Sequence, residues 1–251
     1  MNRTTITLNN SEIEVDVGLT NATDFYEKLG VEPSKKWLYL SREDDIDIPL
    51  LPDEHLVVHG GERIFEGEIN PHIGENPPVR QSVCPEFNGK KLDAGLDKAK
   101  VTGRVLQEMD NDVQPNKLFV DLAGQVDAFV AGDLTIVLQD TDSYFTIPVS
   151  DDDVIDLESC AQADRKPPSG QKYYKIKIDG AKYKVDGQKI TGEKILSRVA
   201  KSYTEWTLNQ KLRGGRRKPI EPEEAVDLTQ PGIERFETVR RQAQQGDIIG
   251  V

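Results

Sequence analysis

The chain contains the same order of sequence signals three times. In each copy a helix-like segment, a strand-like run, a short apolar stretch and a turn precede a phenylalanine, and the copies lie roughly 80 to 90 residues apart. We align Phe65, Phe145 and Phe236 as the last strands of the copies. Such a repeat predicts small modules, each with its own modest core, rather than one large domain.

The third copy shows the pattern most clearly. Residues 173–178 and 182–185 alternate in polarity on either side of Asp179-Gly180, which predicts a β-hairpin. Thr191 is the expected N-cap of a helix with an apolar face on residues 194–200. The other expected elements are strands at 205–209, 219–220 and 234–239, with one helical turn at 222–226.

We predict three domains at residues 1–70, 82–149 and 171–239, followed by a flexible tail at 240–251. A hairpin-led mixed sheet crossed by one helix, in about 70 residues, is an α+β fold of the β-grasp kind. Three generic α+β domains are the alternative. The segment 150–171 is polar and is expected to be a mobile linker.

Charge is distributed unevenly along the chain. Residues 171–251 carry 17 Lys/Arg and 11 Asp/Glu, whereas residues 1–170 carry 15 and 33. The net charge of -12 argues against nucleic acid as a partner. No apolar run approaches the roughly 20 residues of a membrane span, and no signal peptide is expected. A cytoplasmic protein is predicted, with Cys84 and Cys160 as free thiols.

Other chemistry is not expected. His55 and His59 are spaced as zinc ligands on a helix could be, but their segment reads as a turn, so we predict no metal site. We find no set of catalytic residues and no cofactor motif, and the chain is predicted not to be an enzyme.

Residues 176–239 resemble the bacterial multi-ubiquitin domain, a ubiquitin-like β-grasp module that occurs in tandem. The resemblance is clear in the third copy, moderate in the second and weak in the first. The matching features are Asp179-Gly180, Ile190-Thr191-Gly192, Leu208 to Gly215, Glu221 to Leu228 and Pro231 to Phe236.

The resemblance implies three tandem ubiquitin-like β-grasp domains that act as a protein modifier. Genes of this family tend to lie beside genes for ubiquitin-activating-like and conjugating-like enzymes and a deubiquitinase-type metallopeptidase. These enzymes and the target proteins are the implied partners, and a role in bacterial antiviral defence is implied as well. The alternative is a non-conjugated scaffold that displays three ubiquitin-like surfaces.

A modifier needs a flexible tail that ends in glycine, because a side chain would crowd the channel of the activating enzyme. We expect processing between Gly246 and Asp247, which would remove residues 247–251. A terminus at Gly250 or Val251, or an ordinary frayed end, stays open. Arg240 and Arg241 are expected to bind the partner enzymes, since ubiquitin also carries arginines in its tail.

An internal segment also matches the end of ubiquitin. Leu212-Arg213-Gly214-Gly215 precedes the last predicted strand, so a cut there would remove the strand that completes the sheet. We interpret the segment as a loop whose glycines form the turn. Its cations are expected either to bind an acidic partner or simply to be solvated: Arg213, Arg216, Arg217 and Lys218.

Overall fold

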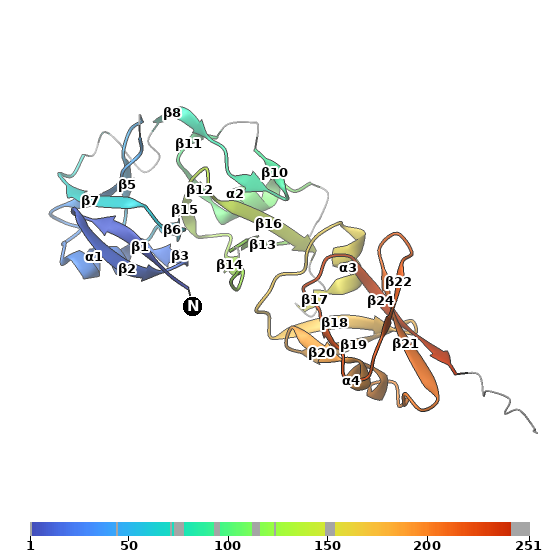
Figure 1. The fold of residues 1–251 in the computed structure, drawn as a ribbon. Helices are drawn as coiled ribbons and strands as arrows, with labels where there is room; N and C mark the ends of the chain where they lie inside the picture. Colours follow the sequence, from blue (N-terminus) through green and yellow to red (C-terminus); the bar gives the residue numbers. More distant parts are fainter. Residues whose placement is uncertain are drawn as a thin grey trace, which may run out of the picture. The chain divides into compact units, whose positions relative to one another are not determined.

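The computed structural model describes residues 2–43, 45–70, 72, 78–92, 96–111, 116–122, 124–148 and 154–241. This part of the chain is α+β, mostly strands with four short helices and several mixed sheets (Figure 1). It divides into two compact units, residues 1–146 and 147–251. None of the described helices is long and apolar enough to cross a membrane.

Three sheets share one strand order, and we call them repeats 1, 2 and 3. Repeat 1 has the order β2-β1-β7-β4-β5. Its elements are β1 (Arg3–Leu8), β2 (Ser11–Asp16), α1 (Ala22–Leu29), β4 (Trp37–Leu40), β5 (Ile48–Leu50) and β7 (Arg63–Gly67). Phe25 and Tyr26 of α1 are buried together with Ile6, Leu38 and Ile64 of this sheet.

Repeat 2 has the order β10-β9-β16-β13-β14, and a separate pair, β11-β8, lies outside that sheet. Its elements are β8 (Pro78–Val83), β9 (Glu86–Phe87), β10 (Lys90–Lys91), β11 (Leu96–Lys98), α2 (Gly103–Glu108), β13 (Asn116–Val120), β14 (Ala128–Val130) and β16 (Ser143–Pro148). Leu106 of α2 packs with Phe87, Leu118 and Tyr144 of the sheet.

The sheet of repeat 3 has the order β17-β18-β24-β21-β22, and β19 also pairs with β18. The series β19-β18-β24-β21-β22 matches the other two repeats, and β17 (Ile155–Asp156) is an additional strand. The other elements of repeat 3 are β18 (Tyr173–Ile178), β19 (Ala181–Asp186), α4 (Gly192–Ser197), β21 (Trp206–Leu212), β22 (Arg217–Ile220) and β24 (Ile233–Arg240). Thr191 caps α4 as predicted, since its side chain accepts from the Lys194 amide at 3.4 Å.

Each repeat also contains a short antiparallel ribbon that the sequence pattern did not indicate. The ribbons are β3 (Gly18–Asn21) with β6 (His55–Val58), β12 (Lys100–Thr102) with β15 (Thr135–Val137), and β20 (Lys189–Thr191) with β23 (Ala225–Asp227). The helical turn predicted at 222–226 is therefore wrong, because its second half is strand β23.

The ribbons of repeats 1 and 2 join into one four-stranded sheet with the order β12-β15-β6-β3. Strand β15 pairs with β6 in parallel, with Ile136 opposite His55. The two cores also exchange side chains across this contact. Val137 packs into the core of repeat 1, and Val57 packs into the core of repeat 2. The two repeats therefore form one compact unit.

The alignment of the three phenylalanines is wrong by one residue in repeat 3. In the last strands, Ile64 lies opposite Leu8, Tyr144 opposite Phe87, and Phe236 opposite Ile178, so these residues are equivalent. All three are buried. The residue equivalent to Phe65 and Phe145 is therefore Glu237. A shift of one residue moves a strand side chain to the opposite face of its sheet.

The segment predicted as a mobile linker is ordered where the structure describes it. Strand β17 (Ile155–Asp156) pairs in parallel with β18, and helix α3 (Leu157–Gln162) follows directly. Leu157 and Cys160 are buried, and Asp156 caps the helix by accepting from the Glu158 amide at 3.1 Å. The prediction of a linker is wrong for residues 154–162, whereas the limits proposed for three separate domains stay predictions.

Helices α3 and α4 lie on opposite sides of the sheet of repeat 3 (Figure 1). Ile176 and Ile178 are buried on one face of β18, and Lys177 lies on the other because side chains alternate along a strand. Lys177 donates to Glu158 of α3 at 2.6 Å. The sheet is thus covered on its second face by a segment that precedes β18.

Candidate partner-binding surface

Strand β24 lies in the interior of its sheet and ends at Arg240. It pairs with β18 on one side and with β21 on the other, from Trp206 opposite Arg240 to Lys211 opposite Arg235. Loss of β24 would therefore divide the sheet in two. Of the twelve residues predicted as the tail, Arg240 belongs to this strand and Arg241 follows it.

The internal match to the end of ubiquitin lies in a hairpin, as predicted. Leu212 is the last residue of β21, and the turn leads directly into β22. Gly214 and Gly215 have φ values of 79° and 81°, a conformation that favours glycine. The Leu212 amide donates to the Arg216 carbonyl at 2.8 Å, which closes the turn. Cleavage after Gly215 would separate β22 and β24 from the rest of the sheet.

The four cations predicted in this hairpin are exposed but mostly paired. Arg213 forms an ion pair with Asp164, Arg217 with Glu237 at 3.1 Å, and Lys218 with Glu224 at 2.5 Å. Their charges are therefore partly balanced by the repeat itself. The side chain of Arg216 has no ion-pair partner within the described part of the chain.

The two cations at the end of β24 are both exposed and lie beside Trp206. Arg241 donates its amide to the Glu205 carbonyl at 2.7 Å and its Nε to the Trp206 carbonyl at 3.4 Å. The indole of Trp206 also lies under the ammonium of Lys201, 4.1 Å from the ring centroid. Val239, with 54% of its surface exposed, lies next to them. This end of the sheet combines an apolar contact area with positive charge, which suits a protein partner.

The predicted processing residues, Gly246 and Asp247, lie outside the described residues.

The structure places the predicted cations in two groups, one in the β21–β22 hairpin and one at the end of β24.

Sequence reasoning missed a clasp that holds the last strand of each repeat. The hairpin residues Asn9, Asn88 and Asp179 have φ values of 45°, 52° and 46°. Each side chain accepts an amide from its last strand: Glu66 at 2.8 Å, Thr146 at 2.9 Å and Thr238 at 2.8 Å. The repeated Asn or Asp at the hairpin was the available signal, because these residues tolerate this backbone and bond to nearby amides.

In repeat 3 the clasp residue itself carries a charge, whereas in repeat 2 the neutral Asn88 side chain donates to the carboxylate of Asp110 at 3.3 Å. Asp179 also accepts from Lys201 at 2.8 Å and from the Thr238 hydroxyl at 2.6 Å. Partial burial would raise the pKa of Asp179, but these hydrogen bonds outweigh burial and hold the pKa below its usual value. Because Lys201 also contacts Trp206, the clasp fixes one edge of the basic group at the end of β24.

The outer faces of the repeats differ in chemistry. Tyr39 stacks on Phe65 in repeat 1 with ring centroids 5.7 Å apart, and Phe119 stacks on Phe145 in repeat 2 at 5.6 Å. The equivalent pair in repeat 3 is Asn209 opposite Glu237. This face is therefore aromatic in repeats 1 and 2 and polar in repeat 3, where α3 covers part of it.

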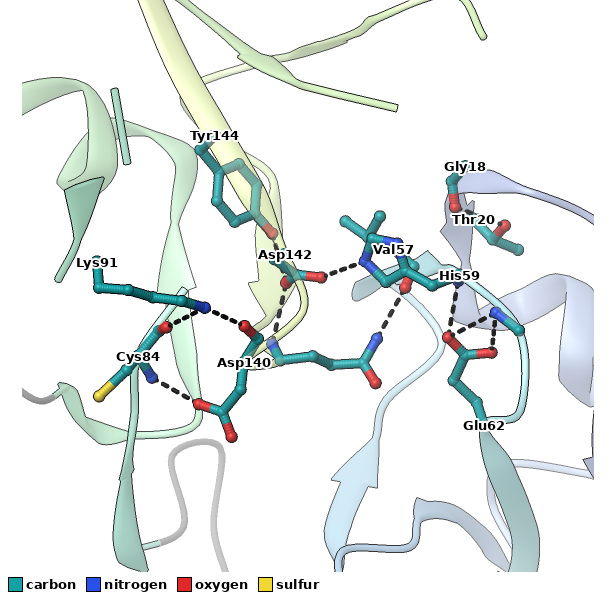
Figure 2. A network of polar contacts seen from close by, with 12 residues as sticks. Gly18, Thr20, Val57, His59, Glu62, Cys84, Lys91, Asp140, Asp142 and Tyr144 are labelled. Atoms are coloured by element: carbon teal, nitrogen blue, oxygen red, sulfur yellow. Dashed lines mark hydrogen bonds and ion pairs between the residues drawn. The ribbon is translucent and has the colours of Figure 1, made fainter. Parts of the chain in front are cut away.

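His59 takes part in the contact between repeats 1 and 2 (Figure 2). His59 Nε2 lies 2.8 Å from Asp142, which is fully buried and also accepts from the Tyr144 hydroxyl at 2.9 Å. The hydrogen bond to Asp142 raises the pKa of His59, although burial opposes the rise. His55 lies in β6 and its Nε2 is 3.4 Å from the Asn21 side chain, so the turn predicted for this segment is wrong.

A second polar contact crosses the same junction. Lys100 Nζ lies 2.6 Å and 2.8 Å from the two carboxylate oxygens of Glu54, and both residues are 3% exposed. Gln139 adds a hydrogen bond from its side-chain amide to the Val57 carbonyl at 2.8 Å (Figure 2). Within the described residues, no group of three or more His, Cys, Asp or Glu side chains could hold a metal ion.

Both cysteines are free thiols, as predicted. Burial raises the pKa of the Cys160 thiol to about 12, so this residue stays protonated at neutral pH. Cys160 is a fully buried residue of α3, so it is a core residue rather than a reactive one.

Residues 174–241 match the family model for multiubiquitin. The chain carries a multiubiquitin-like domain. Searches of curated proteins and of solved structures give no significant match. The multiubiquitin match confirms the resemblance seen in the sequence, and it covers both groups of predicted cations. It begins after α3, so the helix that covers the second face of the sheet is not part of the matched segment.

Proposed function

We propose that the three repeats are tandem ubiquitin-like β-grasp domains and that the chain is a protein modifier activated at its C-terminal end. The shared strand order of the three sheets and the multiubiquitin match support the β-grasp assignment. The observation that carries the proposal is the end of β24. This interior strand ends at Arg240, so the residues after it can enter a partner's active centre while the sheet stays complete.

The modifier is a substrate of other enzymes rather than an enzyme itself. A ubiquitin-activating-like enzyme would adenylate the terminal carboxylate, and a conjugating-like enzyme would pass it to a target. A deubiquitinase-type metallopeptidase would first expose Gly246 by removing residues 247–251. These partners are proposed from the resemblance of residues 176–239 to the multi-ubiquitin family.

Intact-mass analysis tests the processing step. The full chain is incubated with a metallopeptidase encoded beside it, and we expect loss of five residues after Gly246. The Gly246→Val variant is expected to resist cleavage because a branched side chain does not pass a channel built for glycine. An unchanged mass, or a cut after Gly215 in the hairpin, contradicts the proposal.

The basic end of β24 gives a second test. Replacing Arg240 and Arg241 by glutamate should slow ATP-dependent loading onto the activating enzyme by about tenfold, because complementary charge speeds encounter. Folding should be unchanged, since both side chains are exposed. Arg216→Glu, a charge reversal at the hairpin, is the matched control. If the double variant and the parent load equally, Arg240 and Arg241 do not bind the activating enzyme.

The scaffold alternative is favoured by one feature of repeat 2. Phe129 is 49% exposed and packs edge-on against Phe119, 5.8 Å away, so an aromatic surface is available for binding. Deletion of residues 242–251 separates the two functions. A modifier loses attachment to targets, whereas a scaffold keeps its partners.

A further inference from the structure

Repeats 1 and 3 have grooves at equivalent places, between the hairpin-edge strand and the helix. The groove of repeat 3 has a volume of about 330 Å³ and is lined by Asp186, Lys189, Ile190, Lys194, Ser197 and Arg198. That of repeat 1 has a volume of about 410 Å³ and is lined by Val15, Asp16, Leu19, Thr20, Asp24, Phe25, Glu27 and Lys28.

The helix N-caps Asn21 and Thr191 fix which groove residues are equivalent. Asp24 of repeat 1 then corresponds to Lys194 of repeat 3, and Leu19 corresponds to Lys189. The same fold thus has an acidic groove in repeat 1 and a basic groove in repeat 3. Arg198 and Asp186 have counterparts of the same charge in Lys28 and Asp16, so the grooves differ in charge at Lys189, at Lys194 and at Ser197, whose counterpart is Glu27.

The cations of the repeat 3 groove are exposed and form no ion pairs with other described residues. Lys189, Lys194 and Arg198 have no ion-pair partner in the part of the chain that the structure describes. Ile190, which is 7% exposed, supplies an apolar element between them. A ligand in this groove would therefore meet apolar surface surrounded by positive charge.

The neighbouring strand is open on its outer edge. Among the described residues, β19 pairs only with β18. A two-residue turn makes Ala181 and Ile178 a hydrogen-bonded pair, so the alternate residues Lys182, Lys184 and Asp186 direct their amides and carbonyls outward. Such an edge can take up another extended strand.

Lysines on an edge strand also prevent aggregation, and this accounts for Lys182 and Lys184. It does not account for Lys194 and Arg198, which project from or directly follow helix α4. Lys182 is moreover paired with Asp156 at 2.6 Å. Lys194 and Arg198, by contrast, have no ion-pair partner among the described residues.

We propose that the groove between β19 and α4 of repeat 3 binds an extended acidic segment of a partner protein. The segment adds as a strand to the outer edge of β19, places an apolar side chain on Ile190, and sets carboxylates beside Lys189, Lys194 and Arg198. The acidic groove of repeat 1 repels the same segment, so repeat 3 binds it and repeat 1 does not.

The test uses the full chain and a short synthetic peptide of alternating valine and glutamate. Fluorescence anisotropy is expected to show binding to the parent. Replacing Lys194 by aspartate and Lys189 by leucine gives repeat 3 the side chains that repeat 1 has at these two groove positions, and the affinity should fall by about tenfold or more. Backbone amides of Lys184 and Asp186 should gain protection from hydrogen exchange when the peptide is bound.

Two matched variants distinguish the groove from general charge. Arg216→Glu together with Arg217→Glu changes a basic site of repeat 3 outside the groove, and Asp24→Lys changes the groove of repeat 1. Both should leave binding of the valine–glutamate peptide within about twofold, as expected for charges distant from the bound segment. All of these positions are exposed, so amide spectra of the variants should remain those of a folded chain.

The proposal is overturned if a serine–glutamate peptide or single-stranded DNA binds as tightly as the valine–glutamate peptide. Either result would mean that positive charge alone attracts polyanions. Equal loss in the Arg216/Arg217 variant, or no protection of the β19 amides, would overturn it as well. None of these outcomes bears on the C-terminal residues, so the modifier proposal is tested separately.

Discussion

At the scale of single residues, the clasp position of the hairpin is asparagine in repeats 1 and 2 and aspartate in repeat 3. Asn9 and Asn88 supply a neutral acceptor, and Asp179 supplies a charged one. Asp179→Ala removes the bonds to Thr238 and Lys201 and should lower the free energy of unfolding by about 1–3 kcal/mol. Asp179→Asn is the matched control, since it restores the residue of the other repeats and should recover most of this loss.

Because of Asp179, the stability of the chain should fall at low pH. Its pKa is depressed in the folded state, so its contribution to stability is present above the unfolded value and is lost as pH falls through the folded one. Urea unfolding at several pH values should show this decline in the parent and a weaker one in Asp179→Asn. Identical pH profiles would mean that the charge of Asp179 contributes nothing.

The contribution of His59 to stability should depend on pH in the opposite direction. Its pKa is raised by the hydrogen bond to Asp142, so the stabilisation is complete below the unfolded value and is lost as pH rises through the folded value. An NMR titration of the His59 ring should give a pKa above that of free histidine. Asp142→Asn should lower it, whereas Tyr144→Phe keeps the ion pair and should not reverse the shift. A ring pKa at or below the free value in the parent would refute the pairing.

At the scale of elements, the pairing of β6 with β15 depends on a buried ion pair beside it. Lys100→Met leaves the Glu54 carboxylate buried without its cation and should cost about 3–5 kcal/mol of unfolding free energy. Glu54→Gln added to this variant should restore much of the stability, because no charge is left to desolvate. Urea denaturation followed by fluorescence of Trp37, with Trp206 replaced by phenylalanine, measures both. Additive losses in the double variant would show that the two residues are not coupled.

At the scale of the whole molecule, the two compact units should unfold separately. Repeats 1 and 2 share Val57 and Val137 across their cores, so they should melt together, and repeat 3 with β17 and α3 should melt in another transition. Calorimetry of the Lys100→Met variant should shift only one of two transitions. Three separate transitions, or a shift of both, would contradict this division.

Local signals in the sequence predicted most strands and helices of repeat 3. Alternating polarity, the Asp179-Gly180 turn and the Thr191 cap each act over a few residues, and the structure confirms them. They also indicated that the Arg213-Gly214-Gly215 segment is a turn, because glycine is required by the local backbone there. The family of the last repeat was visible in the same residues and is confirmed by the match over 174–241.

The features of the fold and of the groove that local signals did not predict depend on contacts between distant segments. The face occupied by Phe236 depends on its partner Ile178, and the order of residues 154–162 depends on the sheet that α3 covers. The joining of β6 to β15, and the proximity of Lys189 to Lys194 and Arg198 in one groove, arise from pairing and packing. No short window of sequence contains these arrangements, because hydrogen bonds and burial between remote segments form only once the chain has folded.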